Sequence, residues 1–105
     1  MEQNQFQELQ ILEQTLQNLL LQKQNFQMEL SETQSALNEI EHSSDDIYKI
    51  VGQLMLKSDK KKISLELSEK SRLLELRLRA MEKQEESMMR KLETLRDSVV
   101  DSKNN

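Results

Sequence analysis

The sequence contains no cysteine and no proline, and Gly52 is its single glycine. Without cysteine the chain has neither a disulfide framework nor a thiolate metal site, which fits a cytoplasmic location. Without proline and with one glycine, almost nothing in the sequence interrupts a helix. Aromatic side chains are limited to Phe6, Phe26 and Tyr48, so a compact core rich in aromatic residues is not expected.

Long hydrophobic runs and a strongly basic segment are also missing. No segment approaches the ~18 consecutive apolar residues of a membrane-spanning helix, so no membrane partner is expected. The N-terminal segment has neither a basic nor an apolar region, so a signal peptide is not expected. The run Lys60-Lys61-Lys62 has no aromatic neighbours for base stacking, and the net charge is −4. We therefore interpret this run as a solvated helix face and expect no nucleic-acid partner.

Groups for catalysis are equally scarce. His42 is the only histidine, and no cysteine or second histidine completes a transition-metal site. Asp45 and Asp46 lack the spacing of a calcium loop. The sequence has no glycine-rich phosphate loop and no nucleophile with a nearby base. It predicts a protein that is not an enzyme and that holds no cofactor or metal.

What the sequence does contain is a heptad repeat, which predicts a first helix over residues 2–44. Ten positions follow alternating spacings of three and four residues: Leu9, Leu12, Leu16, Leu19, Lys23, Phe26, Leu30, Thr33, Leu37 and Ile40. All of them except Lys23 and Thr33 are apolar. Such a seam is typical of a coiled coil. The other faces of this helix are rich in glutamine, with ten in the first 34 residues.

A second heptad series predicts another helix over residues 59–101, with Ser58 or Asp59 as its N-cap. Its seam positions are Leu67, Ser71, Leu74, Leu78, Met81, Glu85, Met88, Leu92, Leu95 and Val99. Folding the chain back about Gly52 sets Leu37 opposite Leu67 and Leu9 opposite Leu95. Seam positions then meet seam positions, as an antiparallel coiled coil requires.

Two seam positions carry opposite charges, Lys23 and Glu85. On opposite helices they fall about one turn apart in this register. Either they form a pair that fixes the register, or each side chain reaches separately to solvent. The sequence leaves both interpretations open.

Between the helices, residues 47–57 have the character of a β-hairpin. Gly52-Gln53 suits a two-residue type II′ turn, which needs a positive φ at its first central residue. The predicted opposite pairs are Val51 with Leu54, Ile50 with Met55, and Lys49 with Leu56. Both faces of this ribbon are largely apolar, and a lone two-stranded hairpin is marginal in water. We therefore expect something outside this chain to cover or extend it.

These elements predict a mainly α fold in a single domain over residues 1–105. Two long helices form an antiparallel coiled-coil hairpin, with one short β-hairpin at the bend. Several apolar residues in the N-terminal half of the first helix and the C-terminal half of the second lie off the seam and face water: Phe6, Ile11, Leu20, Leu21, Met89 and Val100. They bind a variable partner or contact a neighbouring subunit, and composition favours neither.

The segment from Tyr48 to Lys57 resembles the central hairpin of prefoldin β-class subunits. The stretch from Leu78 to Glu86 resembles the second helix of archaeal β subunits, which are related to eukaryotic prefoldin subunit 6. One hairpin rather than two points to the β class rather than the α class. The modest length favours the archaeal form.

The resemblance implies a hexamer of two α-class and four β subunits, whose hairpins join in a β-barrel platform. It implies an ATP-independent chaperone that binds non-native proteins at the coiled-coil tips and delivers them to a group II chaperonin. The implied assembly residues are Tyr48, Ile50, Val51, Gly52, Leu54, Met55 and Leu56. The implied client-binding residues are Phe6, Leu9, Ile11, Leu12, Leu92, Leu95, Val99 and Val100.

The main alternative is a structural coiled-coil scaffold or tether without client binding. It accounts for the heptads equally well, but it does not account for an apolar hairpin centred on the only glycine. A more distant alternative is nucleic-acid binding through the second helix, which would be sensitive to salt.

Overall fold

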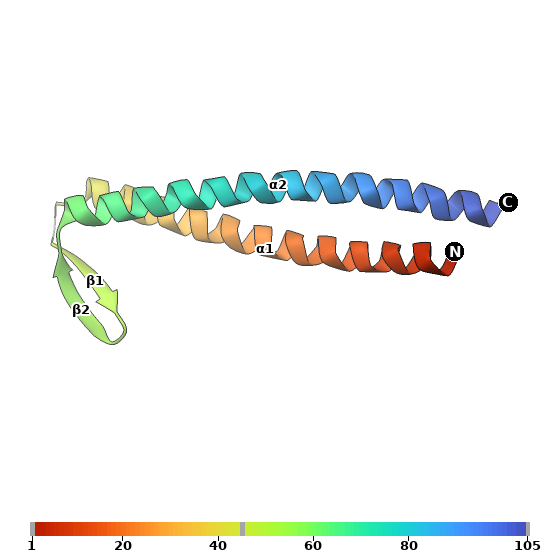
Figure 1. Cartoon of the computed structure of the whole chain (residues 1–105). Coiled ribbons are helices and arrows are strands. Elements are labelled where there is room, and N and C mark those ends of the chain that lie inside the picture. The colour runs from red at the N-terminus through yellow and green to blue at the C-terminus, as the bar shows by residue number, and fades with distance from the viewer. Residues whose placement is uncertain (1, 45, 105) are drawn as a thin grey trace. The chain divides into compact units, whose positions relative to one another are not determined.

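The computed structural model describes residues 2–44 and 46–104, so Asp45 of the predicted turn lies outside the described residues. Its elements are helix α1 (Glu2–His42), strand β1 (Ile47–Val51), strand β2 (Leu54–Ser58) and helix α2 (Lys60–Asn104), in that order (Figure 1). The predicted mainly α fold, two long helices with one β-hairpin between them, is confirmed. The first helix ends at His42 rather than residue 44, and the second begins at Lys60 rather than residue 59.

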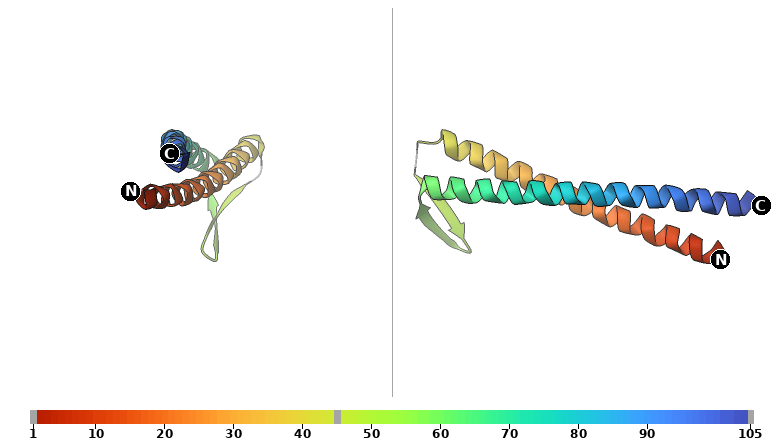
Figure 2. Two further views of the ribbon diagram at one scale, coloured as in Figure 1. Left: turned by 90° about the vertical axis from the view of Figure 1, so that its right-hand side faces the viewer. Right: turned by 45° about the horizontal axis from the view of Figure 1, so that its top comes forward.

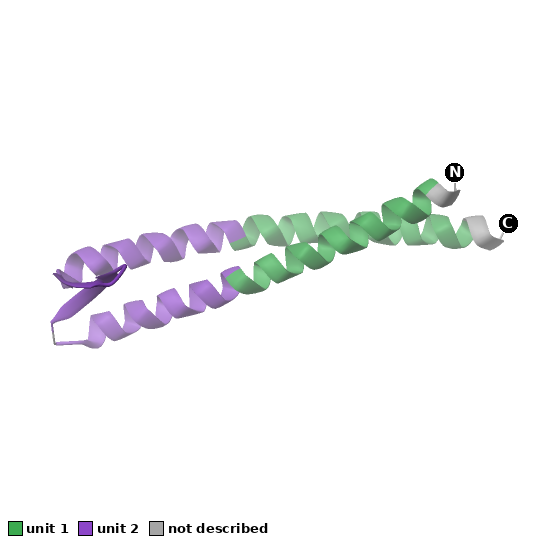
Figure 3. Cartoon of the chain, turned by 90° about the horizontal axis from the view of Figure 1, so that it is seen from below, with its two compact units in different colours: residues 1–25, 78–105 green, residues 26–77 purple. Residues whose placement is uncertain are grey.

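The chain divides into two compact units, each containing part of both helices (Figure 3). Unit 1 comprises the α1 segment up to Asn25 and the α2 segment from Leu78 onward. Unit 2 comprises Phe26–Arg77, which includes the hairpin. Within each unit the two helical segments run antiparallel and contact each other through their seams.

The burial of side chains follows the heptads. Every predicted seam position is buried or half-buried, and the most buried apolar residues are Leu19, Leu78 and Leu92 in unit 1 and Ile63 and Leu74 in unit 2. Thr33 is a buried polar seam residue, and its hydroxyl donates to the Glu29 carbonyl at 2.7 Å. Its hydrogen bond explains how a polar residue is accommodated in the seam.

Contacts between the helices lie close to the predicted register. In unit 1 the Gln5 side chain donates to Ser98 Oγ at 3.4 Å, and Lys23 Nζ donates to Glu85 Oε2 at 2.9 Å. In unit 2 the Arg77 guanidinium lies over the Phe26 ring, 5.5 Å from its centroid. The Lys23–Glu85 contact favours the register-fixing pair over separate solvation.

The start of α2 also holds the end of α1 in unit 2. Asp59 is the N-cap, since its carboxylate accepts from the Lys61 N–H at 3.3 Å, whereas Ser58 belongs to β2. Lys60 donates its ammonium to the carbonyls of Glu41 (3.2 Å) and Ser43 (2.8 Å). A cation at a helix C-terminus is favourable because the last carbonyls carry partial negative charge. The sequence indicated that Lys60 is part of a solvated helix face and did not predict these two hydrogen bonds.

The hairpin adopts the predicted register and turn. Val51 pairs with Leu54, Ile50 with Met55 and Lys49 with Leu56. Gly52 has φ +62°, and no non-glycine residue in the described part of the chain has a positive φ. A positive φ at the first central residue alone is the mark of type II′.

Candidate interaction surfaces

The hairpin presents apolar side chains to solvent in unit 2. Six are 50–70% exposed: Tyr48, Ile50, Val51, Leu54, Met55 and Leu56. In Figures 1 and 2 the two strands project away from the helical segments of the same unit. Apolar residues scattered singly on a surface are ordinary, but six exposed apolar residues among twelve hairpin residues are a cluster.

The register assigns these six side chains to both faces of the ribbon. Residues directly opposite each other share a face. One face therefore carries Val51, Leu54 and Leu56, and the other carries Tyr48, Ile50 and Met55. Each strand also has one outer edge, because the sheet contains only two strands. The hairpin thus offers two apolar faces and two strand edges to a partner.

One end of the hairpin is tied to its own helix. Lys49 on β1 forms an ion pair with Glu66 on α2 at 3.4 Å, and both side chains are about half exposed. Lys57 on β2 pairs with Asp46 at 3.6 Å. Exposed pairs of this kind contribute little to stability.

The predicted client-binding residues fall into three environments in unit 1. Phe6, Ile11 and Val100 are exposed, at 49%, 66% and 54%. Leu9, Leu12, Leu95 and Val99 are half-buried along the seam. Leu92 is 7% exposed and belongs to the seam core. The exposed residues present ready apolar surface, whereas Leu92 does not.

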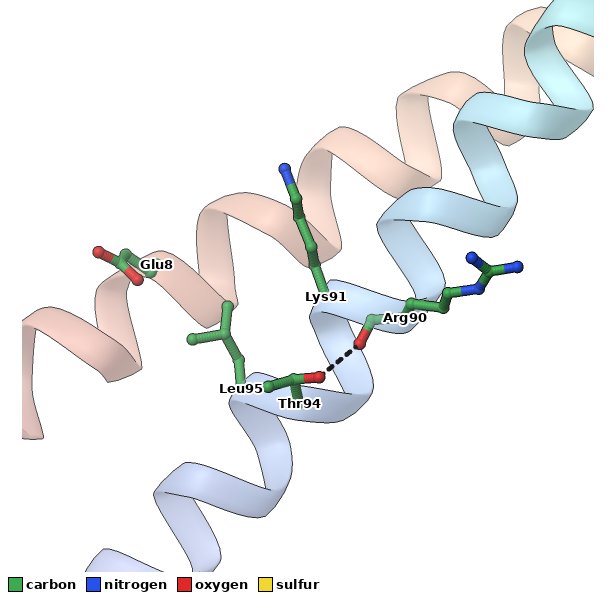
Figure 4. Close-up of a pocket in the computed structure, with 5 residues that line it drawn as sticks. All are labelled: Glu8, Arg90, Lys91, Thr94 and Leu95. Carbon is green, nitrogen blue, oxygen red and sulfur yellow. Dashed lines mark hydrogen bonds between the residues drawn. The ribbon is translucent and has the colours of Figure 1, made fainter.

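A shallow hollow lies beside this group in unit 1. Figure 4 shows its lining residues, Glu8 from α1 and Arg90, Lys91, Thr94 and Leu95 from α2. The Thr94 hydroxyl donates to the Arg90 carbonyl at 3.0 Å and is thereby satisfied within the helix. Leu95 forms the apolar part of a hollow whose rim carries both signs of charge.

The seam of unit 1 contains one perturbed ionisable group. The pKa of Lys23 is raised, chiefly because its ammonium donates a hydrogen bond to Glu85, with partial desolvation acting in the opposite direction. The side chains of Lys23 and Glu85 are 19% and 21% exposed. The pair is therefore sheltered but still reaches water.

Chemistry-bearing clusters are not found in the described residues. No group of three or more His, Asp or Glu side chains in residues 2–44 and 46–104 is arranged to hold a metal ion. The His42 Nδ1–H donates to the Asn38 carbonyl at 2.8 Å, which places the ring at the last turn of α1. Neither described helix is long and apolar enough to cross a membrane.

Comparison with known proteins decides the family. The prefoldin subunit family model matches residues 1–102. The chain belongs to the prefoldin subunit family. The prefoldin subunit beta of Methanothrix thermoacetophila is 41% identical over 99 residues, covering 92% of this chain and 82% of that protein. The prefoldin subunit beta of Thermococcus kodakarensis is 46% identical over 90 residues, covering 84% and 77%.

The fold agrees with a solved prefoldin structure. The crystal structure of the prefoldin beta subunit from Thermococcus strain KS-1 superposes with a TM-score of 0.88 at 39% identity. The match covers 96% of this chain and 90% of that one. The resemblance to archaeal prefoldin β subunits is confirmed. Prefoldin subunits are components of chaperones, and membership in the family implies assembly with other prefoldin subunits.

The prefoldin hairpin and helix ends were predicted from sequence, but four exposed apolar residues of unit 2 were not. These are Met28, Leu65, Leu73 and Leu76. Their heptad positions could have predicted this exposure, since none of the four lies on the predicted seam. Ile63 was also missed, because strict alternation from Leu67 points to Ser64 instead. Because Ile63 is buried, the α2 seam begins with two successive four-residue spacings, from Ile63 to Leu67 and from Leu67 to Ser71.

Proposed function

We propose that this chain is the β-class subunit of an ATP-independent chaperone hexamer of two α-class and four β subunits. Its hairpin joins other hairpins in a β-barrel platform. The free helix ends bind non-native proteins and pass them to a group II chaperonin. Family membership supports assembly with other prefoldin subunits. The exposed apolar side chains of the hairpin support the platform, and those of the helix ends support client binding.

The observation that carries the proposal is the hairpin with both faces apolar and both edges open. Half or more of each of its six apolar side chains is in water. Burying such side chains is worth about 25 cal/mol per Å² of apolar surface, so a partner that covers both faces is strongly favoured. A scaffold or tether has no need of such a surface at the bend.

Client binding is assigned to the helix ends of unit 1. Phe6, Ile11 and Val100 are the primary contacts because they are already exposed. Leu9, Leu12, Leu95 and Val99 extend the surface from the edge of the seam, and Leu92 supports them from beneath. Each contact is weak, and several subunits gripping one client together supply affinity by avidity.

Assembly is tested by native mass measurement of the chain alone and mixed with an archaeal prefoldin α subunit. A discrete hexamer that forms only in the mixture is the expected result. A free dimer or an open filament, unchanged by the α subunit, would support the scaffold alternative.

Client binding is tested on the assembled hexamer with Phe6, Ile11 and Val100 all changed to Ser. The variant should form hexamers but lose most of its ability to suppress aggregation of an unfolded protein. The matched control changes Leu65, Leu73 and Leu76 to Ser, because these residues are 65%, 48% and 46% exposed but lie in unit 2. Equal suppression by both variants would contradict the assignment of the helix ends.

Transfer is tested by adding a group II chaperonin to a client held by the hexamer. Client that moves to the chaperonin without ATP is the expected result. Client that stays with the hexamer, or is released to aggregate, would contradict the delivery step.

A further inference from the structure

The outer faces of the two helices differ sharply in unit 1. On α1, the row opposite the seam consists of Gln7, Gln10, Gln14, Gln17, Leu21 and Gln24, all exposed. On α2, the equivalent heptad positions are Arg79, Lys83, Glu86, Arg90, Glu93 and Asp97, also all exposed. Every position is uncharged in the first row, and every position is charged in the second.

The α2 row behaves as an ordinary solvated face. Glu86 and Arg90 form an ion pair at 2.8 Å with i,i+4 spacing, which supports the helix itself. The α1 row has no charges to pair in this way. Its amides are long, flexible and able both to donate and to accept hydrogen bonds.

Apolar side chains accompany the α1 amides. Leu20 and Leu21 are 41% and 60% exposed although they lie within the helix and far from its ends. With Gln17 and Gln24 they line a shallow hollow on the surface of unit 1. An apolar pair framed by amides is a different surface from the mixed charges of the α2 row.

The composition of the α1 row indicates what kind of partner it could bind. A packed helix from a second copy needs apolar residues at most seam positions, and the row has only Leu21. A charged partner finds no charge to pair with. An extended polypeptide offers one N–H and one C=O per residue to the amides and apolar side chains to the leucines.

The spacing also suits an extended chain. Successive row positions rise by about 4.5–6 Å along the helix, and an extended strand repeats its side-chain direction about every 6.6–6.8 Å. Flexible glutamine side chains span the difference. We infer that the outer face of α1 in unit 1 is a second client-binding surface, which holds extended non-native polypeptide regardless of its net charge. This inference rests on the proposed chaperone function.

Site-specific photo-crosslinking tests it in the assembled hexamer. A benzophenone amino acid is placed at Leu21, at Glu86 on the charged row, or at Phe6. The probes are two unfolded clients of opposite charge, reduced α-lactalbumin and reduced lysozyme. Position 21 should crosslink to both clients with a yield at least about fivefold that of position 86, the ratio expected for a difference of about 1 kcal/mol.

The outcomes separate this inference from the proposed function. Strong crosslinks at position 6 with equally low yields at 21 and 86 would overturn the inference and leave the function standing. No client crosslink at any position would overturn both. A crosslink from position 21 to another subunit, or to only one of the two clients, would also overturn the inference.

A substitution provides the second measurement. Leu20→Gln with Leu21→Gln should weaken client binding about fivefold, or about 1 kcal/mol, with hexamer formation and melting temperature unchanged. Leu65→Gln with Leu73→Gln is the matched control, because these two leucines are 65% and 48% exposed but lie on the other helix and in unit 2. Equal client affinity of the two variants would contradict the inference.

Discussion

A single charged pair interrupts the apolar seam of unit 1. Lys23 and Glu85 meet at 2.9 Å and are each about one-fifth exposed. Sheltered charges are tolerated when they are paired, but a well-packed apolar replacement is often no less stable. The pair therefore has more value for register than for stability, because a shifted alignment would separate the two charges along the seam.

Single and double substitutions test this role. Lys23→Leu or Glu85→Leu alone should lower the melting temperature, because each leaves one sheltered charge without its partner. The double Leu variant should melt at least as high as the parent. Thermal unfolding at neutral pH, followed by circular dichroism, measures all four proteins. Equal melting of both single variants, the double variant and the parent would mean that the two charges are solvated independently.

The raised pKa of Lys23 predicts a dependence on alkaline pH. The stabilisation from the pair is fully present below the ordinary lysine value of 10.5 and is lost as pH rises through the raised value in the folded protein. Above pH 10.5 the free energy of unfolding of the parent should therefore fall relative to that of Lys23→Leu. Urea unfolding across that range measures the difference. A difference of constant size would contradict the raised pKa.

Other residues mark the limit of what the heptads predict. Three- and four-residue spacing identified every seam position from Leu9 to Ile40, because burial in a two-stranded coil follows position closely. It did not identify Ile63, since a local change of spacing is not visible from a regular repeat. It also did not predict that Leu92 is buried whereas Leu95 is only half-buried. The exposure of a seam side chain depends on how closely the two helices approach at that position.

At the scale of elements, the hairpin is the part most dependent on one residue. Gly52 takes φ +62°, and a Cβ built there meets no atom within 4 Å. Space is therefore not the constraint, and the backbone angle alone selects glycine. The turn type and register were predictable because a two-residue loop with one glycine leaves few alternatives. The extra residue of β2, Ser58, was not, because strand ends depend on pairing.

Valine substitutions at the two turn positions isolate this effect. Gly52→Val should destabilise the turn by about 1–2 kcal/mol, because an L-residue is strained at positive φ. Gln53→Val is the control, since residue 53 has no positive φ. Assembly with the α subunit, measured by native mass against concentration, should require more protein for Gly52→Val only. Equal assembly of both variants would contradict a type II′ turn.

At the scale of the whole molecule, the helices are stabilised by contacts within the chain, whereas the hairpin largely is not. The seams of both units bury their own residues, whereas the hairpin buries almost nothing within the chain. Two-stranded ribbons are marginal in water, so the hairpin gains its stability from partners while the helices do not depend on them in the same way. The sequence predicted the hairpin's part of this division, because the predicted register already places apolar residues on both faces of the ribbon.

Hydrogen exchange on the chain alone and in the hexamer measures this division directly. Assembly should slow exchange of amides in residues 47–58, because new strands satisfy the open edges of β1 and β2. Amides of seam residues in unit 1, such as Leu19 and Leu78, should change far less, since their hydrogen bonds are already within helices. Uniform protection along the entire chain would mean that assembly also orders the helices. Protection gained only at the helix ends would place the assembly surface there instead of at the hairpin.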